Sequence, residues 1–230
     1  MRRDHLAENG AHRSRPPIAL RRIAANLIAA SVRALTGVTV HWTAELPTTR
    51  QTIYFANHTS HLDFVVLWSA LPHELREITR PVAAKDYWQG GLRRFLAVKV
   101  FKAVLVERAQ STGAGSGDRL RNAEQSLELL LDAMGEKNSL IIFPEGTRGS
   151  GERVAPFKSG IYYLWRRRPD VSFVPVYLSN LNRILPKGEV LPVPVISRAV
   201  FGAPLQAHPG DSKQTFLENA HAALCALRQA

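Results

Sequence analysis

Short apolar runs typical of buried β-strands alternate with stretches of helical periodicity along most of the chain, and this alternation constrains the fold more than any other feature. Strands separated by helices favour an α/β fold. The expected strands are residues 38–42, 52–57, 80–85, 103–107, 139–144, 172–178 and 195–202. The expected helices are residues 18–35, 61–71, 86–101, 118–134, 159–168 and 212–228. We therefore predict a largely parallel mixed sheet flanked by helices.

The chain divides into three expected parts. Residues 1–17 carry four arginines and no apolar periodicity, so we expect a basic, disordered tail. Residues 18–36 have apolar side chains at helical spacing with arginines near both ends, which predicts an amphipathic helix. Residues 37–230 are expected to form the main domain, since 45% of the 230 residues are hydrophobic, enough for one sizeable core. The composition of Ser111–Gly117 predicts a flexible loop.

The net charge of +11 indicates an anionic partner: nucleic acid, an anionic membrane face or a phosphorylated small molecule. We expect no nucleic acid, because the sequence has no zinc spacing, recognition helix or aromatic–basic motif. Cys225 is the only cysteine, so an intrachain disulfide is excluded and a reducing compartment fits. The uncharged run Ile23–Val32 is too short to span a membrane, and no signal-peptide cleavage site is evident.

The stretch "NHTSHLD", Asn57–Asp63, has two interpretations. His58 can accept a proton near neutral pH, and Asp63 could hold its ring from across a turn. Alternatively, Ser60 and Asp63 form a helix capping box, in which Asp63 turns toward the Ser60 backbone N–H and His58 is a loop residue. We expect no metal site, since His58, His61 and Asp63 lack a cysteine or a two-histidine helix face.

A second polar stretch, "FPEGTRG", follows the expected strand 139–144. Gly146 would let the backbone approach a ligand closely, and Arg148 offers a planar fork for phosphate oxygens. Glu145 could accept hydrogen bonds from a hydroxylated substrate, or pair with Arg148 or Arg108. The alternative is a polar turn with an internal ion pair.

Arg108 closes the apolar strand 103–107, where an arginine is a natural phosphate ligand, although an exposed strand-end arginine is an equally simple interpretation. Lys158 adds a cation near a helix start, or is a solvated lysine. In a largely parallel sheet the carboxyl ends of strands meet at one edge. We therefore expect three segments to lie together: the one at the strand end Asn57, the one at the strand end Phe143, and Glu107–Arg108 at the end of the third strand.

Taken in order, the His-x4-Asp segment, Arg108, "FPEGTR" and the later "VPV" resemble the glycerolipid acyltransferase family, which includes the lysophosphatidic acid acyltransferases. The resemblance covers about Ile53–Val176. It implies an acyltransferase domain in residues 37–230, with His58 and Asp63 as the catalytic pair. It implies acceptor and phosphate contacts at Arg108, Glu145, Gly146, Thr147 and Arg148, with support from Asn57, Ser60, Lys158 and the structural proline Pro175. In "KAVLVER" this chain has Lys102 where the family commonly has glycine, and Glu107 in place of aspartate.

The implied reaction moves a fatty acyl chain from a thioester to the free hydroxyl of a lysophospholipid, with lysophosphatidic acid giving phosphatidic acid as the foremost case. No cofactor would be bound, and acyl-CoA or acyl carrier protein would be the co-substrate. We expect His58 to take the hydroxyl proton and backbone N–H groups after Asn57 to bind the oxyanion. Alternatives are acylation of another lyso-lipid, a basic nucleic-acid- or membrane-binding protein without catalysis, and a hydrolase that uses Ser60.

A lipid substrate implies contact with an anionic membrane surface. The helix expected from Ile18 to Leu35 could lie in the interface, and the aromatic and basic residues of Tyr87–Lys102 repeat the pattern. Either segment could instead pack on the core. The expected location is the cytoplasmic face of the cell membrane, as a peripheral or monotopic protein.

Overall fold

A computed structural model describes residues 18–45, 50–60, 62–86, 88, 91–107, 116–181 and 196–229. Among these residues seven strands form one sheet in the order β1-β7-β6-β2-β5-β3-β4. The strands are β1 Thr39–Trp42, β2 Thr52–Ala56, β3 Thr79–Ala84, β4 Val104–Val106, β5 Ser139–Ile142, β6 Ser172–Ser179 and β7 Arg198–Phe201. Every neighbouring pair is parallel except β6 and β7. The predicted α/β fold with a largely parallel mixed sheet is confirmed.

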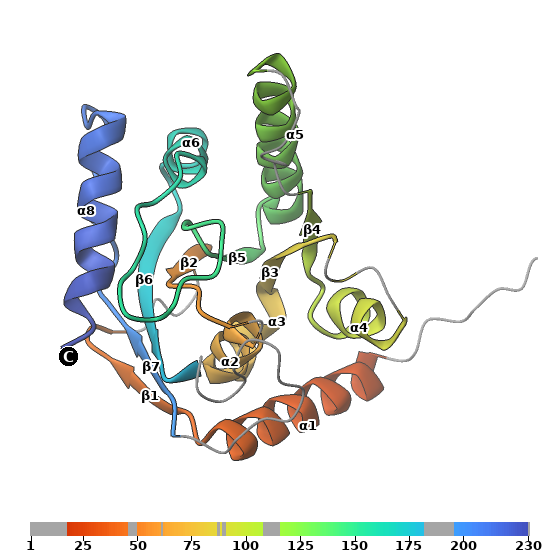
Figure 1. Cartoon of the computed structure of the whole chain (residues 1–230). Helices are drawn as coiled ribbons and strands as arrows, with labels where there is room; N and C mark the ends of the chain where they lie inside the picture. The colour runs from red at the N-terminus through yellow and green to blue at the C-terminus, as the bar shows by residue number, and fades with distance from the viewer. Residues whose placement is uncertain are drawn as a thin grey trace, which may run out of the picture.

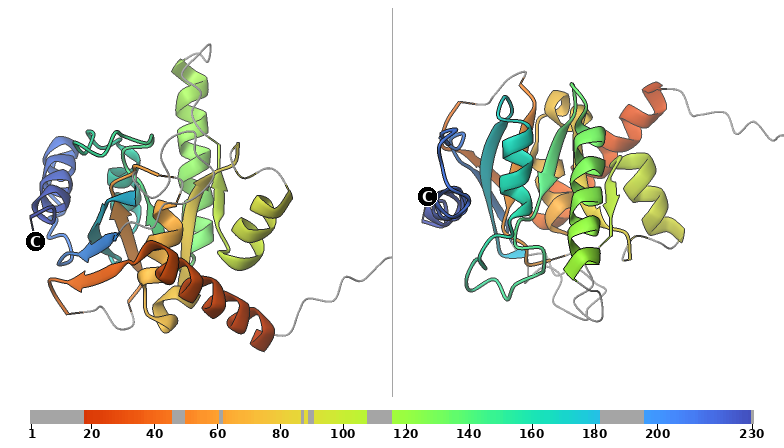
Figure 2. Two further views of the ribbon diagram at one scale, coloured as in Figure 1. Left: turned by 60° about the horizontal axis from the view of Figure 1, so that its bottom comes forward. Right: turned by 90° about the horizontal axis from the view of Figure 1, so that it is seen from above.

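Helices cover both faces of the sheet (Figures 1 and 2). They are α1 Ile18–Thr36, α2 Asp63–Ala70, α3 His73–Ile78, α4 Gly91–Phe95, α5 Ser116–Met134, α6 Gly160–Arg167 and α8 Lys213–Ala226, with the π-helical segment η1 Leu96–Val100. Tyr54 and Ala56 of β2 pack toward α1 and α2, whereas Ile53 and Phe55 pack toward α6 and α8. Because both faces of β2 are covered, all five of its residues are buried, which explains its continuous apolar sequence.

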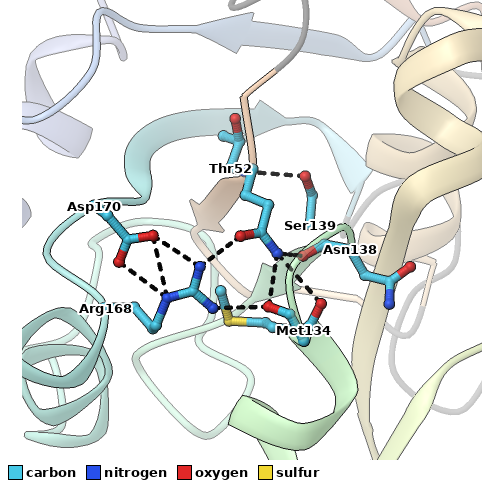
Figure 3. A network of polar contacts seen from close by, with 8 residues as sticks. Thr52, Met134, Asn138, Ser139, Arg168 and Asp170 are labelled. Carbon is cyan, nitrogen blue, oxygen red and sulfur yellow. Dashed lines mark hydrogen bonds and ion pairs between the residues drawn. The ribbon is translucent and has the colours of Figure 1, made fainter.

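Hydrogen bonds around Arg168 join the amino ends of the central strands (Figure 3). The Arg168 guanidinium donates to Gln51 Oε1, to Gly135 O at 2.8 Å, and to both carboxylate oxygens of Asp170. Gln51 Nε2 in turn donates to the carbonyls of Gly135 and Asn138, each at 3.0 Å. The segments that lead into β2, β5 and β6 are therefore tied together at one end of the sheet, and the opposite end carries the polar motifs.

Helix α1 packs on α2 by one face and leaves apolar side chains on the other. Ala29 is buried, and the Arg33 guanidinium donates to the carbonyls of Ser69 and Leu71 at the end of α2. The exposed apolar side chains are Ile23 at 56%, Leu27 at 63% and Leu35 at 59%. Helix α1 can thus pack on the core and contact a membrane interface at once, since these two roles use different faces of the helix. No helix within the described ranges is long and apolar enough to cross a membrane.

Several boundaries differ from prediction. The helix α3 was not expected, because its six residues are too few to show a periodicity. The helix predicted for 86–101 is instead α4 followed by η1, and its Phe101 is buried while Phe95 is exposed. Helix α5 begins at Ser116, so the last two residues of the predicted flexible loop are helical. The predicted tail 1–17 and Tyr87 lie outside the described residues.

Candidate active site

Two segments meet at the carboxyl end of the sheet because β2 and β5 are parallel neighbours, with Phe55 paired to Ile142. The segment after β2 begins at Asn57, and the segment after β5 begins at Phe143. The Gly149 N–H donates to the His58 carbonyl at 2.8 Å, which joins them directly. The two polar motifs noted in the sequence therefore form one site, as their positions after parallel strands predicted.

His58 Nδ1 lies 2.8 Å from Asp63 Oδ2. Because an ionised carboxylate can only accept, Nδ1 carries the proton of this bond, which makes Nε2 the nitrogen with the free lone pair in the neutral ring. The Asp63 side chain is fully buried, whereas that of His58 is 20% exposed. The His58 ring also stacks on Phe143, with centroids 4.4 Å apart and planes at 23°. Phe143 was not among the predicted site residues, although it begins the "FPEGTR" motif.

Asp63 accepts backbone hydrogen bonds as well as the imidazole bond. Its Oδ2 accepts the N–H groups of Thr59 at 2.6 Å and Ser60 at 2.8 Å. The same oxygen therefore makes both the imidazole contact expected of a catalytic pair and the backbone contact expected of a capping box. The prediction that the Ser60 side chain caps the helix is wrong. The N-cap is Leu62, and Ser60 Oγ accepts the Leu62 N–H, because helix α2 begins only at Asp63.

These contacts occupy the backbone donors that were expected to bind an oxyanion. The N–H groups of Thr59, Ser60 and Leu62 donate as described, and the N–H of His58 donates to Glu145 Oε1. His61 lies outside the described residues. These four N–H groups therefore do not act as the expected oxyanion donors in this structure, because they hold two carboxylates and the Ser60 hydroxyl, and donors elsewhere at the start of α2 stay a prediction.

Glu145 was expected to face the substrate or an arginine, and the structure gives it different partners. Glu145 is buried, with 4% of its surface exposed. Oε1 accepts the His58 N–H at 2.6 Å, and Oε2 accepts the Ala155 N–H at 2.8 Å. Neither Arg148 nor any other described cation is within ion-pair distance of it, and Arg108 lies outside the described residues. Glu145 therefore holds the backbone of His58 in place through this hydrogen bond.

Gly146 has a positive φ of 70°, which disfavours any residue with a side chain. A Cβ there would also lie 2.8 Å from Cδ, Cε and Nζ of Lys158. The Lys158 N–H donates to the Pro144 carbonyl at 2.9 Å, so the whole residue lies against this loop. Thr147 and Arg148 are exposed beside it. The exposed Arg148 and Lys158 thus belong to the region in which the Gly149 N–H bonds the His58 carbonyl.

Asn57 and Pro175 support the site from the sheet. Asn57 Nδ2 donates to the Leu178 carbonyl at 2.8 Å, and Oδ1 accepts the Leu178 N–H at 2.7 Å. This exchange extends the pairing of β2 with β6 by one residue and fixes the start of the His58 segment. Pro175 is buried within β6, where an added Cβ at Gly202 would lie 2.8 Å from its Cγ. Both residues are structural supports rather than contacts for a ligand.

Within the described ranges, no three His, Cys, Asp or Glu side chains are grouped so that they could hold a metal ion. The site instead consists of a histidine held by a buried carboxylate, next to a loop bearing cations. Fold and site together define an α/β protein with a histidine held in position for proton transfer.

Residues 37–179 match the family model described as Acyltransferase. The chain therefore belongs to the Acyltransferase family, and the predicted resemblance to the glycerolipid acyltransferases is confirmed at the level of the family.

Among relatives, the 1-acyl-sn-glycerol-3-phosphate acyltransferase of Limnanthes alba is 30% identical over 175 residues, 74% of this chain and 56% of the relative. The enzyme of the same name from Limnanthes douglasii is 31% identical over 153 residues, 64% of this chain and 48% of the relative. "Taffazin" of Dictyostelium discoideum is 28% identical over 150 residues, 63% of this chain and 50% of the relative. The chain thus spans about half the length of these relatives.

The fold is similar to the crystal structure of the 1-acyl-sn-glycerophosphate acyltransferase PlsC from Thermotoga maritima. The TM-score is 0.66 at 16% sequence identity, over 90% of this chain and 78% of that chain. At this identity the likeness concerns the fold.

Proposed function

We propose that residues 37–230 form an acyltransferase domain that moves a fatty acyl chain from a thioester to the free hydroxyl of a lysophospholipid. The preferred acceptor is lysophosphatidic acid, which would give phosphatidic acid. The observation that carries the proposal is the 2.8 Å contact between His58 Nδ1 and the buried Asp63 at the carboxyl end of the sheet. That contact leaves Nε2 as the proton acceptor of a partly exposed imidazole.

The reaction needs a base because an alcohol, with a pKa far above 7, is a weak nucleophile. His58 Nε2 takes the hydroxyl proton while the acceptor oxygen attacks the thioester carbonyl carbon. The tetrahedral intermediate then collapses, the carbon–sulfur bond breaks, and His58 returns the proton to the departing thiol. The acyl chain passes directly from sulfur to oxygen, so no residue of the protein carries it.

Asp63 is suited to hold the base in one orientation. Its Oδ2 is fixed by the Thr59 and Ser60 N–H groups, so the imidazole bonds to an oxygen that is itself immobile. When His58 takes the proton, the resulting imidazolium lies beside a buried carboxylate, which stabilises it. Stacking on Phe143 restrains the ring from its face.

The oxyanion needs donors other than those of the His58 segment. The Thr147 and Arg148 N–H groups are our candidates. The flanking N–H groups are already used, since that of Gly146 donates to the Phe143 carbonyl of the same loop and that of Gly149 to the His58 carbonyl of the segment after β2. Backbone N–H groups aimed at a developing negative charge contribute strongly when water is excluded.

The acceptor phosphate would bind to Arg148 and Lys158, which belong to the loop that contacts His58. Arg108, which follows β4, is the third proposed phosphate ligand and lies outside the described residues. Arginine suits this task because its guanidinium matches phosphate oxygens in a bidentate way.

The proposed donor is acyl-CoA or acyl carrier protein, and the proposed setting is the anionic cytoplasmic face of the cell membrane. The outer face of α1, with Ile23, Leu27 and Leu35 exposed, supports contact with lipid at the level of the headgroups. Ser60 does not support the rival hydrolase, since it is 2% exposed and its Oγ accepts the Leu62 N–H.

The test is to incubate the purified protein with a panel of lysophospholipids and both thioester donors, and to identify the products by mass spectrometry. His58→Ala and Asp63→Asn should lower acyl transfer by at least about 100-fold, the range of general base catalysis. The matched control is His41→Ala, an exposed histidine of β1, which should retain full turnover. Near-normal transfer by a folded His58 variant would reject the site, and thioester hydrolysis without an acceptor product would favour the hydrolase.

A further inference from the structure

A cavity lined by cationic side chains lies at the amino end of the sheet, away from His58. Its volume is about 560 Å³, and its wall includes Thr79 at the start of β3 and Asn138 just before β5. Since β2, β3 and β5 are parallel, this wall is at the opposite end of the sheet from the segment that follows β2. The cavity therefore plays no part in the proposed proton transfer.

The lining of this cavity is strongly basic. Its cationic side chains are Arg22, Arg76, Lys99, Lys102 and Lys137. Among the described lining residues the one carboxylate is Glu77, which forms an ion pair with Arg22 and whose Oε1 lies 3.6 Å from His73 Nε2. Positive side chains therefore outnumber negative ones in the part of the lining that the structure describes.

Arg76 differs from the other cations of the lining because it is buried, with only 7% of its surface exposed. Its Nη2 donates to Asn26 Oδ1 at 2.6 Å and its Nη1 to the Leu71 carbonyl at 3.3 Å, and both acceptors are neutral. No described carboxylate forms an ion pair with it. Burial first, and then the neighbouring Arg33, lower the pKa of Arg76, whereas the Glu74 and Glu77 carboxylates, which lie beyond ion-pair distance, oppose that shift. A buried cation that lacks a direct ion pair is unfavourable, and a bound anion would offset part of that cost.

Lys102 shows that the chain keeps a cation here against a conformational cost. Its φ is +52°, in the left-handed region that favours glycine. A residue with a Cβ is less stable in that conformation by about 1 kcal/mol or more. The Lys102 amine donates to the Glu77 carbonyl at 3.2 Å, which places it on the cavity wall. The departure from glycine noted in the sequence thus adds positive charge to this cavity.

The cavity also has an apolar side and adjoins the outer helix. The Arg76 guanidinium lies over the Trp68 ring at 5.1 Å, and Val100 and Phe101 line the same wall. Ala25 of α1 borders the cavity, and the neighbouring α1 residues Ile23 and Leu27 are exposed. A ligand with a phosphate group and an apolar remainder matches this combination better than a fully hydrated ion does.

We propose that this cavity binds the phosphate of an anionic lipid headgroup, with the Arg76 guanidinium and the Lys99 and Lys137 amines as its ligands. It is a second anion site, separate from the acceptor site beside His58. Its occupation would orient α1 on a bilayer and satisfy the buried charge of Arg76. Its existence does not depend on acyl transfer, so it is tested by binding alone.

The test measures binding of the full chain to vesicles of phosphatidylcholine with and without phosphatidylglycerol. The variant Lys99→Gln/Lys137→Gln removes two exposed cations and leaves the buried Arg76 intact. Binding to the anionic vesicles should weaken roughly 30-fold, since a basic residue at an anionic surface contributes about a factor of five. Weak binding to phosphatidylcholine alone should not change.

The matched control is Arg121→Gln/Lys213→Gln, which removes the same charge from exposed positions on α5 and α8. An equal loss in this control would overturn the site, because it would show diffuse attraction by net charge. Lys99→Arg/Lys137→Arg should restore anionic-vesicle binding, and failure to do so would also count against the proposal. A second measurement distinguishes a lipid headgroup from free phosphate as the ligand: the midpoint of thermal unfolding with and without millimolar inorganic phosphate. A rise in midpoint that the glutamine double variant loses would assign the cavity to soluble phosphate and overturn the lipid headgroup.

Discussion

Glu145 offers the sharpest test of how this site is built. Its two carboxylate oxygens accept the N–H groups of His58 at 2.6 Å and Ala155 at 2.8 Å, and the residue is 4% exposed. Each hydrogen bond to a charged group contributes about 1.5–3 kcal/mol to stability, and leaving a buried N–H unpaired costs about 1–3 kcal/mol. Glu145→Gln keeps the shape but turns one acceptor into a donor that faces an N–H group. We therefore expect the free energy of unfolding to fall by about 2 kcal/mol.

The effect on turnover should exceed the effect on substrate binding, because the lost bond holds the backbone of His58 itself. A displacement of a reacting group by about 1 Å can lower the rate by about 100-fold. We expect Glu145→Gln to lower kcat toward that extent while KM for the lysophospholipid stays within about a factor of three. Steady-state kinetics with a saturating thioester donor measure both quantities, and urea unfolding measures the stability.

The control is Glu152→Gln, an exposed glutamate of the same connecting segment, which should change neither quantity. The opposite pattern would refute the reasoning: a large rise in acceptor KM with kcat retained would make Glu145 a substrate ligand, as the sequence had suggested. Activity equal to that of the control would show that the two backbone bonds do not position His58.

Two further predictions concern the loop and the far end of the sheet. Gly146→Ala should lower the free energy of unfolding by about 1–2 kcal/mol, because φ is +70°. It should also raise the acceptor KM, because the new Cβ would displace the Lys158 side chain, which lies 2.8 Å away. The control is Gly160→Ala, where a Cβ meets nothing within 4 Å, and equal effects of the two variants in unfolding and kinetic assays would contradict this account. Arg168→Leu should lower the melting temperature at neutral pH by removing the bonds to Gln51, Gly135 and Asp170. The hydrogen bond from Arg168 holds the pKa of Asp170 below its usual range, so this carboxylate stabilises the fold above its ordinary pKa and the contribution is lost as pH falls through the lowered value. The difference in melting temperature between wild type and variant should therefore narrow in acid, by a modest amount since Asp170 is 63% exposed, and a difference that widens in acid would contradict the sign.

Much of the fold was predictable because the pattern of apolar residues depends on local geometry. Continuous apolar runs such as Ile53–Ala56 and Leu140–Ile142 indicated strands buried on both faces, and the structure places them as central neighbours. Where local geometry was ambiguous, prediction failed. The six-residue α3 is too short for a period, and the change from α4 to η1 leaves no mark in the sequence.

The order of residues along the chain specifies which residue types follow the parallel strands, and therefore which side chains can meet at one end of the sheet. It does not specify which hydrogen bonds each carboxylate accepts, because the N–H groups that donate to it come from segments that only folding brings together. Asp63 Oδ2 serves the imidazole and two backbone N–H groups at once, which no spacing rule separates. Glu145 became a brace because folding brings the N–H groups of His58 and Ala155 to its two oxygens. Likewise, periodicity marks the apolar positions of α1, but only packing on α2 decides which of them are covered and which face outward, because burial is a property of neighbours and not of the helix.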